Sequence, residues 1–183
     1  DERRDPELMS GPPRTLAAYI RHLTGLPYWG ERIATTARQA AGRAGAPFLS
    51  GRDKPAVVRE ARILVALIGL GVGVSIWIGS VALVVYVVVL ALMGQPFLRA
   101  YLLAEHTGCP FVPEMLRNTR TTKSTALVRR LAWNMPYHAE HHAYPAVPFH
   151  ALPDAHRVLR DRIEVQAQGY VPVHREIIAD LGT

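Results

Sequence analysis

The longest hydrophobic stretch of the chain starts at Ile63 and ends at Leu98, and it contains no Asp, Glu, Lys, Arg or His. A single helix from Ile63 to Met93 would be roughly 46 Å long at 1.5 Å per residue. The hydrocarbon core of a bilayer is only about 30 Å thick, so one helix would need an unusually large tilt. The pattern therefore predicts two membrane crossings, a transmembrane helical hairpin over residues 59–103 that turns at Gly79-Ser80.

Two shorter amphipathic patterns precede this stretch, over residues 13–44, and they are separated at Gly25-Leu26-Pro27. Their apolar positions recur at helical spacing. These positions are Leu16, Tyr19, Ile20 and Leu23 in the first pattern, and Trp29, Ile33 and Ala37 in the second. Basic helices that carry Tyr and Trp beside a spanning segment are typical of the bilayer interface. We expect interfacial helices here, and packing on a soluble domain remains the alternative.

The region after the hairpin, residues 104–183, returns to mixed polar and apolar positions. Its pattern predicts a cytosolic helical cap, with one helix from about Pro153 to Gln168 that stops at Gly169. The predicted fold class is thus all-α and integral to the membrane. A transmembrane hairpin is flanked on one side by interfacial amphipathic helices and on the other by this C-terminal cap.

Charge supports this topology, since basic residues stand on both sides of the apolar stretch. Positively charged flanks favour the cytoplasmic side of a membrane. If both flanks lie on that side, the chain must cross the membrane an even number of times. The net charge is +6, but no nucleic-acid-binding motif accompanies it, and we expect no nucleic-acid partner. The flanking cations are Lys54, Arg59 and Arg62 before the stretch, and Arg99, Arg117, Arg120, Lys123, Arg129 and Arg130 after it.

The candidate chemistry lies in the cap, where His138, His141 and His142 follow one another at metal-ligand spacing. On a helix these side chains share one face. Asn134 is positioned to cap the start of such a helix. The hairpin returns His106 to the same membrane face, and His106 is therefore predicted to be a fourth ligand.

Zinc hydrolysis is disfavoured, because His-Glu-x-x-His is absent and Glu140 stands one position too early for the inverted pattern. Imidazole also suits iron, a metal that activates oxygen. Iron is accordingly the metal we expect.

These residues carry a resemblance to the membrane fatty acid desaturase family. His138-Ala139-Glu140-His141-His142, followed by Tyr144-Pro145 and Pro148-Phe149-His150-Ala151-Leu152-Pro153, resembles the third histidine box of that family. Glu105-His106-Thr107-Gly108 and Asn118-Thr119-Arg120-Thr121 are similar to the segment that precedes this box. Asp5-Pro6-Glu7-Leu8 is similar to the tail that commonly follows the second box.

The resemblance implies an O2-dependent fatty acyl desaturase whose histidines hold two irons. Such an enzyme takes hydrogens from two neighbouring methylene groups of an acyl chain and leaves a double bond and water. It implies iron-ligand roles for His106, His138, His141 and His142. The first two boxes, His-x-x-x-His and His-x-x-His-His, are absent, since only His22 precedes His106. Residues 1–183 are therefore expected to be the C-terminal part of a desaturase-like domain, inactive alone.

Four further residues are expected to support the ligands through hydrogen bonds: Asn134, Glu140, His150 and His156. For each of them a structural role stays open. Asn134 and His156 suit helix starts, His150 suits a loop, and Glu140 suits an exposed helix face. His174 is expected at the surface.

The partners implied are a lipid or acyl substrate, the membrane, and a separate electron-carrier protein. The basic residues Arg117, Arg120, Lys123, Arg129 and Arg130 either dock an acidic carrier or only hold the membrane orientation. The histidine box is expected on the cytoplasmic side.

Two other functions remain open. The first is a related membrane di-iron hydroxylase or ketolase that acts on a lipid or carotenoid, because the same boxes serve those reactions. The second is a membrane metal-binding or transport protein. Transporters place polar ligands near the middle of spanning helices. Tyr86 is the only ionisable side chain from Ile63 to Leu98, so transport is disfavoured.

Overall fold

The computed structural model describes residues 12–182, and in that part of the chain the protein is mostly helical. Asp5-Pro6-Glu7-Leu8, which carried part of the family resemblance, lies outside the described residues. The chain divides into two compact units. The described part of the first consists of residues 12–13 and 17–97, and that of the second consists of residues 14–16 and 98–182.

The first unit begins with the two helices that the amphipathic patterns predict, α1 (Leu16–Leu23) and α2 (Leu26–Ala40). They are separated at Gly25, whose φ of 71° lies in the left-handed region that glycine adopts without strain. A side chain at this position would also place its Cβ only 2.5 Å from the Cβ of Gln95. Gly25 is thus required by its backbone conformation and by close packing. The location of α1 and α2 at a membrane interface stays a prediction.

The apolar stretch folds as two long helices, α3 (Lys54–Trp77) and α4 (Ala82–His106), and the predicted break at Gly79-Ser80 is confirmed. Gly79 has a φ of 62°, and the N–H of Ser80 donates to the Ser75 carbonyl at 2.9 Å. Within residues 12–182, α4 is the one helix that is long and apolar enough to cross a membrane, with a mean hydropathy of 1.8 in its best window. A double crossing by α3 and α4 is therefore not established by the fold.

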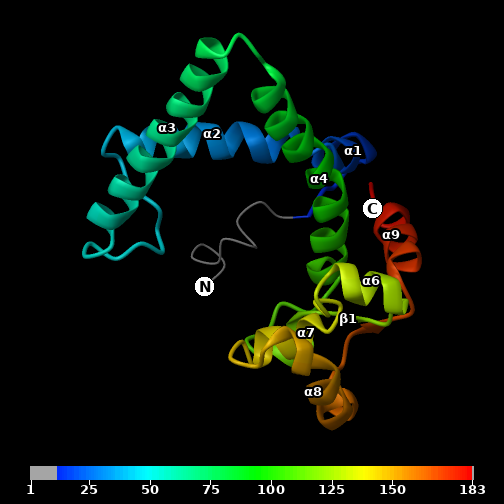
Figure 1. Ribbon diagram of the computed structural model, residues 1–183. Coiled ribbons are helices and arrows are strands. Elements are labelled where there is room, and N and C mark those ends of the chain that lie inside the picture. The colour runs from blue at the N-terminus through cyan, green and yellow to red at the C-terminus, as the bar shows by residue number, and fades with distance from the viewer. Residues whose placement is uncertain (1–11, 183) are drawn as a thin grey trace. The chain divides into compact units, whose positions relative to one another are not determined.

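Helix α2 packs on α3 in the first unit, and Figure 1 shows α2 crossing α3. The Arg62 Nε atom donates to the Ala40 carbonyl at 2.9 Å, which joins the end of α2 to α3. Ala61 is buried on α3, but most large apolar side chains of α3 and α4 are exposed. Such a surface is what a lipid-facing helix needs, because lipid solvates apolar side chains.

The second unit contains mostly short elements connected by turns and loops (Figure 1). They are α5 (Met115–Asn118), β1 (Thr121–Thr122), α6 (Ala126–Leu131), α7 (His138–Ala143), η1 (Phe149–Ala151), α8 (Leu152–Leu159), η2 (Arg160–Arg162), β2 (Gln166–Ala167) and α9 (Tyr170–Ala179).

The prediction of an all-α fold is wrong at one place, because β1 and β2 form a parallel pair with Thr121 opposite Gln166 and Thr122 opposite Ala167. Parallel neighbours need a long crossover connection. Here that connection contains α6, α7 and α8. A pairing over such a distance leaves no periodic signal in either two-residue strand.

The predicted helix from Pro153 to Gln168 is also wrong in extent, because α8 ends at Leu159 and the chain turns through η2 into β2. The turn lets Leu159 and Ile163 pack together against Ala139 of α7 in a small core. The side-chain amide of Gln166 donates to the carbonyls of Arg160 and Ile163, and so satisfies groups that a longer helix would have paired internally. Tertiary packing thus ends the helix early.

Candidate metal centre

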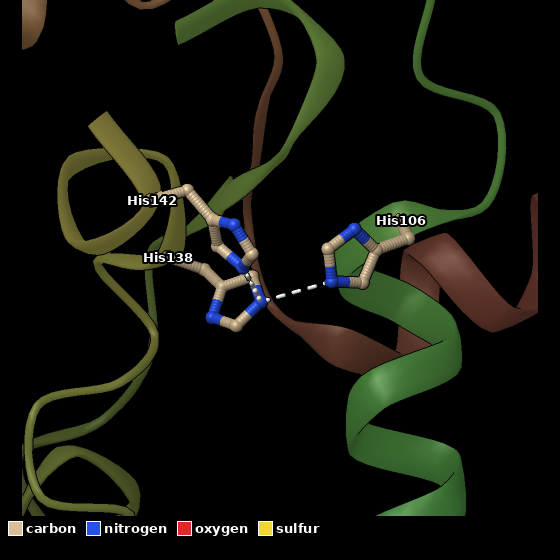
Figure 2. Close-up of side chains that lie close together, drawn as sticks. All are labelled: His106, His138 and His142. Carbon is tan, nitrogen blue, oxygen red and sulfur yellow. Dashed lines mark hydrogen bonds between the residues drawn. The ribbon is translucent and has the colours of Figure 1, made fainter. Parts of the chain in front are cut away.

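Three of the four predicted ligands come together inside the second unit. His106 is the last residue of α4, His138 is the first residue of α7, and His142 lies one helical turn later on α7. Figure 2 shows His106 facing the two α7 histidines from the end of α4. His138 is buried, and the other two are half-buried.

The imidazole nitrogens of this group converge on one another. The Nε2 atom of His138 lies 3.0 Å from that of His106 and 3.1 Å from that of His142. Across the group, the possible ligand atoms lie within 4.8 Å of one another. Two nitrogens about 2.1 Å from a shared metal ion, and at right angles, would be roughly 3.0 Å apart. The three side chains therefore fit as ligands of one first-row metal ion.

His138 is held in the form that binds metals. Burial, with a smaller contribution from the neighbouring imidazoles of His142, His106 and His141, lowers the pKa of His138 from 6.5 to about 2. A metal ligand must be the neutral imidazole, because a protonated nitrogen has no lone pair to give. His138 is in that neutral form at physiological pH.

His141, the fourth predicted ligand, does not join this group. Its ring centroid lies 6.2 Å from that of His138 and 5.8 Å from that of His142. Its Nδ1 atom is buried and has no hydrogen-bond partner among residues 12–182. A buried nitrogen without a partner is unfavourable unless something absent from the chain satisfies it. A ligand role for His141 stays a prediction.

Asn134 does not cap α7, contrary to the prediction, because the helix begins at His138 and Tyr137 precedes it. Asn134 has a φ of 57°, in the left-handed conformation that asparagine tolerates. Its Nδ2 atom donates to the Phe149 carbonyl at 3.1 Å. The Trp133 ring also contacts Phe149, at 4.7 Å between centroids. These contacts connect the segments before and after α7, and so brace the helix that carries the histidines.

Glu140 lies on α7 between the ligand candidates and is fully buried, so the alternative of an exposed carboxylate is wrong. Its Oε2 atom accepts a hydrogen bond from the Thr121 hydroxyl at 2.5 Å, and its Oε1 atom pairs with Nδ1 of His156. The His156 ring stacks at a tilt on Tyr137, at 5.0 Å between centroids. Glu140 therefore connects α7 to β1 and α8.

The remaining histidines have separate positions. His150 is exposed in η1, and its ring contacts that of Phe149. His174 was expected at the surface, but it is half-buried in α9 and its Nε2 atom donates to the Ala100 carbonyl at 3.0 Å. Burial lowers the pKa of His174. The bond holds α9 against the C-terminal part of α4.

Sequence reasoning gave no role to Tyr170, which supports the residue next to His106. Glu105 is fully buried, and its Oε1 atom accepts a hydrogen bond from the Tyr170 hydroxyl at 2.6 Å. The other carboxylate oxygen has no partner among the described residues. Burial, and then the nearby Glu105 charge, raises the pKa of Tyr170, so its hydroxyl remains a donor. No local motif marks Tyr170, since it meets Glu105 only through the packing of α9.

Arg120 must be removed from the predicted basic docking surface, because its side chain is buried and donates to the Ala104 carbonyl. Its backbone N–H donates to the Glu105 carbonyl at 2.9 Å. Arg120 thus satisfies carbonyls at the end of α4, which the helix itself leaves without partners. Among the other cations of that predicted surface, Arg117 pairs through its Nε atom with Glu164 at 2.8 Å. Lys123 and Arg130 are exposed.

Comparison with known proteins adds one finding. The family model described as fatty acid desaturase matches residues 1–174. No curated protein and no solved structure gives a significant match. The matched range includes α3, α4 and every histidine of the candidate centre.

Proposed function

The chain belongs to the fatty acid desaturase family, and we propose that it supplies iron ligands to an O2-dependent fatty acyl desaturase. Proteins of this family are oxidoreductases of lipid metabolism that are generally membrane-bound and generally use iron. Their substrates are lipids or acyl chains.

The observation that carries the proposal is the convergence of His106, His138 and His142, whose Nε2 atoms lie at the spacing of neighbouring ligands. We assign these three to one iron. His141, with its unpartnered buried Nδ1, is assigned to a second iron. Two irons need more histidines than these, and before His106 the chain has only His22. The proposal therefore requires further histidines from outside residues 1–183.

Bound iron would supply the reduction of O2 and the oxidising power that removes two hydrogens from an acyl chain. The chain's own residues position the ligands. The low pKa of His138 keeps its lone pair available to the metal. The hydrogen bonds of Glu140 to Thr121 and His156 fix α7. Tyr170 and Arg120 fix the end of α4 next to His106. Rigid ligand positions of this kind raise metal affinity.

For the membrane we propose that α3 and α4 cross together and that the histidines lie on the cytoplasmic side. The cations on both flanks of the apolar stretch support this orientation. The exposed apolar side chains of α4 would face lipid, from which an acyl substrate can enter. An acidic electron carrier would approach the exposed cations Lys123 and Arg130.

Iron content tests the proposed centre directly. The purified chain, loaded with ferrous iron under nitrogen, is compared with its His106→Ala, His138→Ala and His142→Ala variants by elemental analysis. Each substitution is expected to lower the iron content of the chain, while His150→Ala, at an exposed histidine outside the group, leaves the iron content unchanged. Equal losses in all four variants would show that the convergent group is not an iron site.

Activity is a separate question, and product analysis answers it. The complete reading frame is expressed in a host that is fed fatty acids, and the lipids of that host are analysed by mass spectrometry. A new double bond supports the desaturase, whereas an added oxygen atom would favour the related hydroxylase or ketolase.

A further inference from the structure

A pocket of about 530 Å³ lies in the first unit, remote in sequence from the histidines, where the start of α3 meets the loop that follows α2. Its lining combines cations with apolar side chains. The residues are Gly42, Lys54, Pro55, Val58, Arg59, Arg62 and Ile63.

The cations belong to one face of α3. Lys54, Val58 and Arg62 follow one another at four-residue intervals, and their neighbours Pro55, Arg59 and Ile63 do the same. At 3.6 residues per turn this spacing produces one continuous stripe. Glu60, the acid within this part of α3, points about 150° away from the centre of the stripe. Among residues 12–182, no acidic side chain lines the pocket.

These cations are also available for a ligand. Lys54, Arg59 and Arg62 are exposed and have no ion pair among the described residues. Arg62 uses its Nε atom to bind the Ala40 carbonyl, which orients the guanidinium beside Gly42. Like charges held on one face repel each other, so an anion between them would be stabilising.

The position of the pocket indicates which anion. Ile63 is both the last lining residue and the first residue of the uncharged stretch, and the exposed surface of α3 continues from it through Leu64 and Leu67. A ligand that matches both the basic pocket and the apolar surface of α3 is negatively charged at one end and apolar at the other. Basic clusters at the membrane end of an apolar helix typically bind anionic lipid headgroups.

We propose that this pocket binds the phosphate headgroup of an anionic phospholipid, with the acyl chains lying along α3. The inference depends on the proposed placement of α3 in the membrane, but it does not involve iron or the oxidation reaction. Alkaline carbonate extraction tests membrane insertion separately, and iron content tests the metal centre separately. Failure of lipid binding is therefore distinguishable from failure of the proposed function.

The experiment measures binding of short-chain phosphatidylglycerol and phosphatidylcholine to the full chain in nonionic detergent by native mass spectrometry. Each basic residue near an anionic headgroup contributes a factor of about five in affinity, so Lys54→Gln with Arg59→Gln should weaken phosphatidylglycerol binding roughly 30-fold. The matched control is Lys123→Gln with Arg130→Gln, which removes one exposed lysine and one exposed arginine from the second unit.

The expected result is selectivity for phosphatidylglycerol that the pocket variant loses and the control variant keeps. The charge-preserving pair Lys54→Arg with Arg59→Lys should bind as the parent does, and circular dichroism checks that every variant is folded. Equal binding of both lipids, or equal loss in the control variant, would overturn the proposal. Complete displacement by millimolar inorganic phosphate would also overturn it, because the pocket would then be a site for free phosphate.

Discussion

The buried carboxylate of Glu140 should contribute more to the stability of this protein than any exposed acidic side chain near it. Replacement of Glu140 by alanine tests the structural account of the metal centre. The substitution removes the acceptor for the Thr121 hydroxyl and for Nδ1 of His156. Thr121 is fully buried, so water cannot take the place of the lost oxygen without opening the packing around β1.

The magnitude follows from these two contacts. A buried polar group left without its partner is destabilising by about 1–3 kcal/mol. The buried Thr121 hydroxyl and the half-buried His156 imidazole, together with the space vacated by the side chain, give an expected loss of roughly 3–5 kcal/mol in the free energy of unfolding, as for other broken buried pairs. Glu140→Gln keeps the size and one carbonyl oxygen, so its loss should be only about 1–2 kcal/mol.

Glu140 also holds α7, which carries His138 and His142. The same substitution should therefore also weaken metal binding. Loss of a residue that orients metal ligands typically lowers metal affinity by about 10–100-fold. Both effects are measured on the purified chain in detergent, stability by denaturant unfolding followed by circular dichroism and affinity by ferrous-ion titration. Glu164→Ala is the matched control, because that carboxylate is exposed and, among residues 12–182, its ion pair is with Arg117. A surface pair contributes about 0–1 kcal/mol.

The reasoning would be refuted if Glu140→Ala and Glu164→Ala had the same unfolding free energy and the same iron affinity. It would be refuted in part if Glu140→Ala lost stability but kept its iron affinity. In that case the carboxylate would stabilise the second unit without positioning the histidines.

Two other substitutions test contacts at the ends of α4 and α1. Tyr170→Phe removes the hydroxyl that donates to the buried Glu105 carboxylate at 2.6 Å, and it should destabilise the chain by about 1–3 kcal/mol in denaturant unfolding. Tyr144→Phe, at an exposed tyrosine, should change the stability little. An equal loss of stability in both variants would contradict the assigned hydrogen bond. Gly25→Ala meets a φ of 71° and a Cβ contact of 2.5 Å, and it should lower the thermal unfolding midpoint. Gly30→Ala lies inside α2, and beyond the backbone of that helix no described atom lies within 4 Å of the new Cβ. It should add about 1 kcal/mol of stability and so raise the unfolding midpoint. A higher midpoint for both variants would show that Gly25 is not constrained.

The sequence by itself determined the long elements of this protein. The amphipathic patterns predicted α1 and α2, and the uncharged stretch predicted α3 and α4 with a turn at Gly79-Ser80. The spacing of the histidines predicted that His138, His141 and His142 belong to one helix, as they do in α7, although only His138 and His142 converge with His106. These features depend on residues within a few positions of one another, so their periodicity is visible in the sequence.

Tertiary structure decided the surroundings of the histidines. Glu140 and Arg120 are buried and Tyr170 is half-buried, and no local pattern predicted this. Each acquires its role from a distant partner: His156 on α8, the end of α4, and Glu105. The same is true of Asn134, which pairs with Phe149 beyond α7 instead of capping that helix. A polar side chain is buried only where the fold brings it a partner, and such partners come from non-local packing, which leaves no period in the sequence.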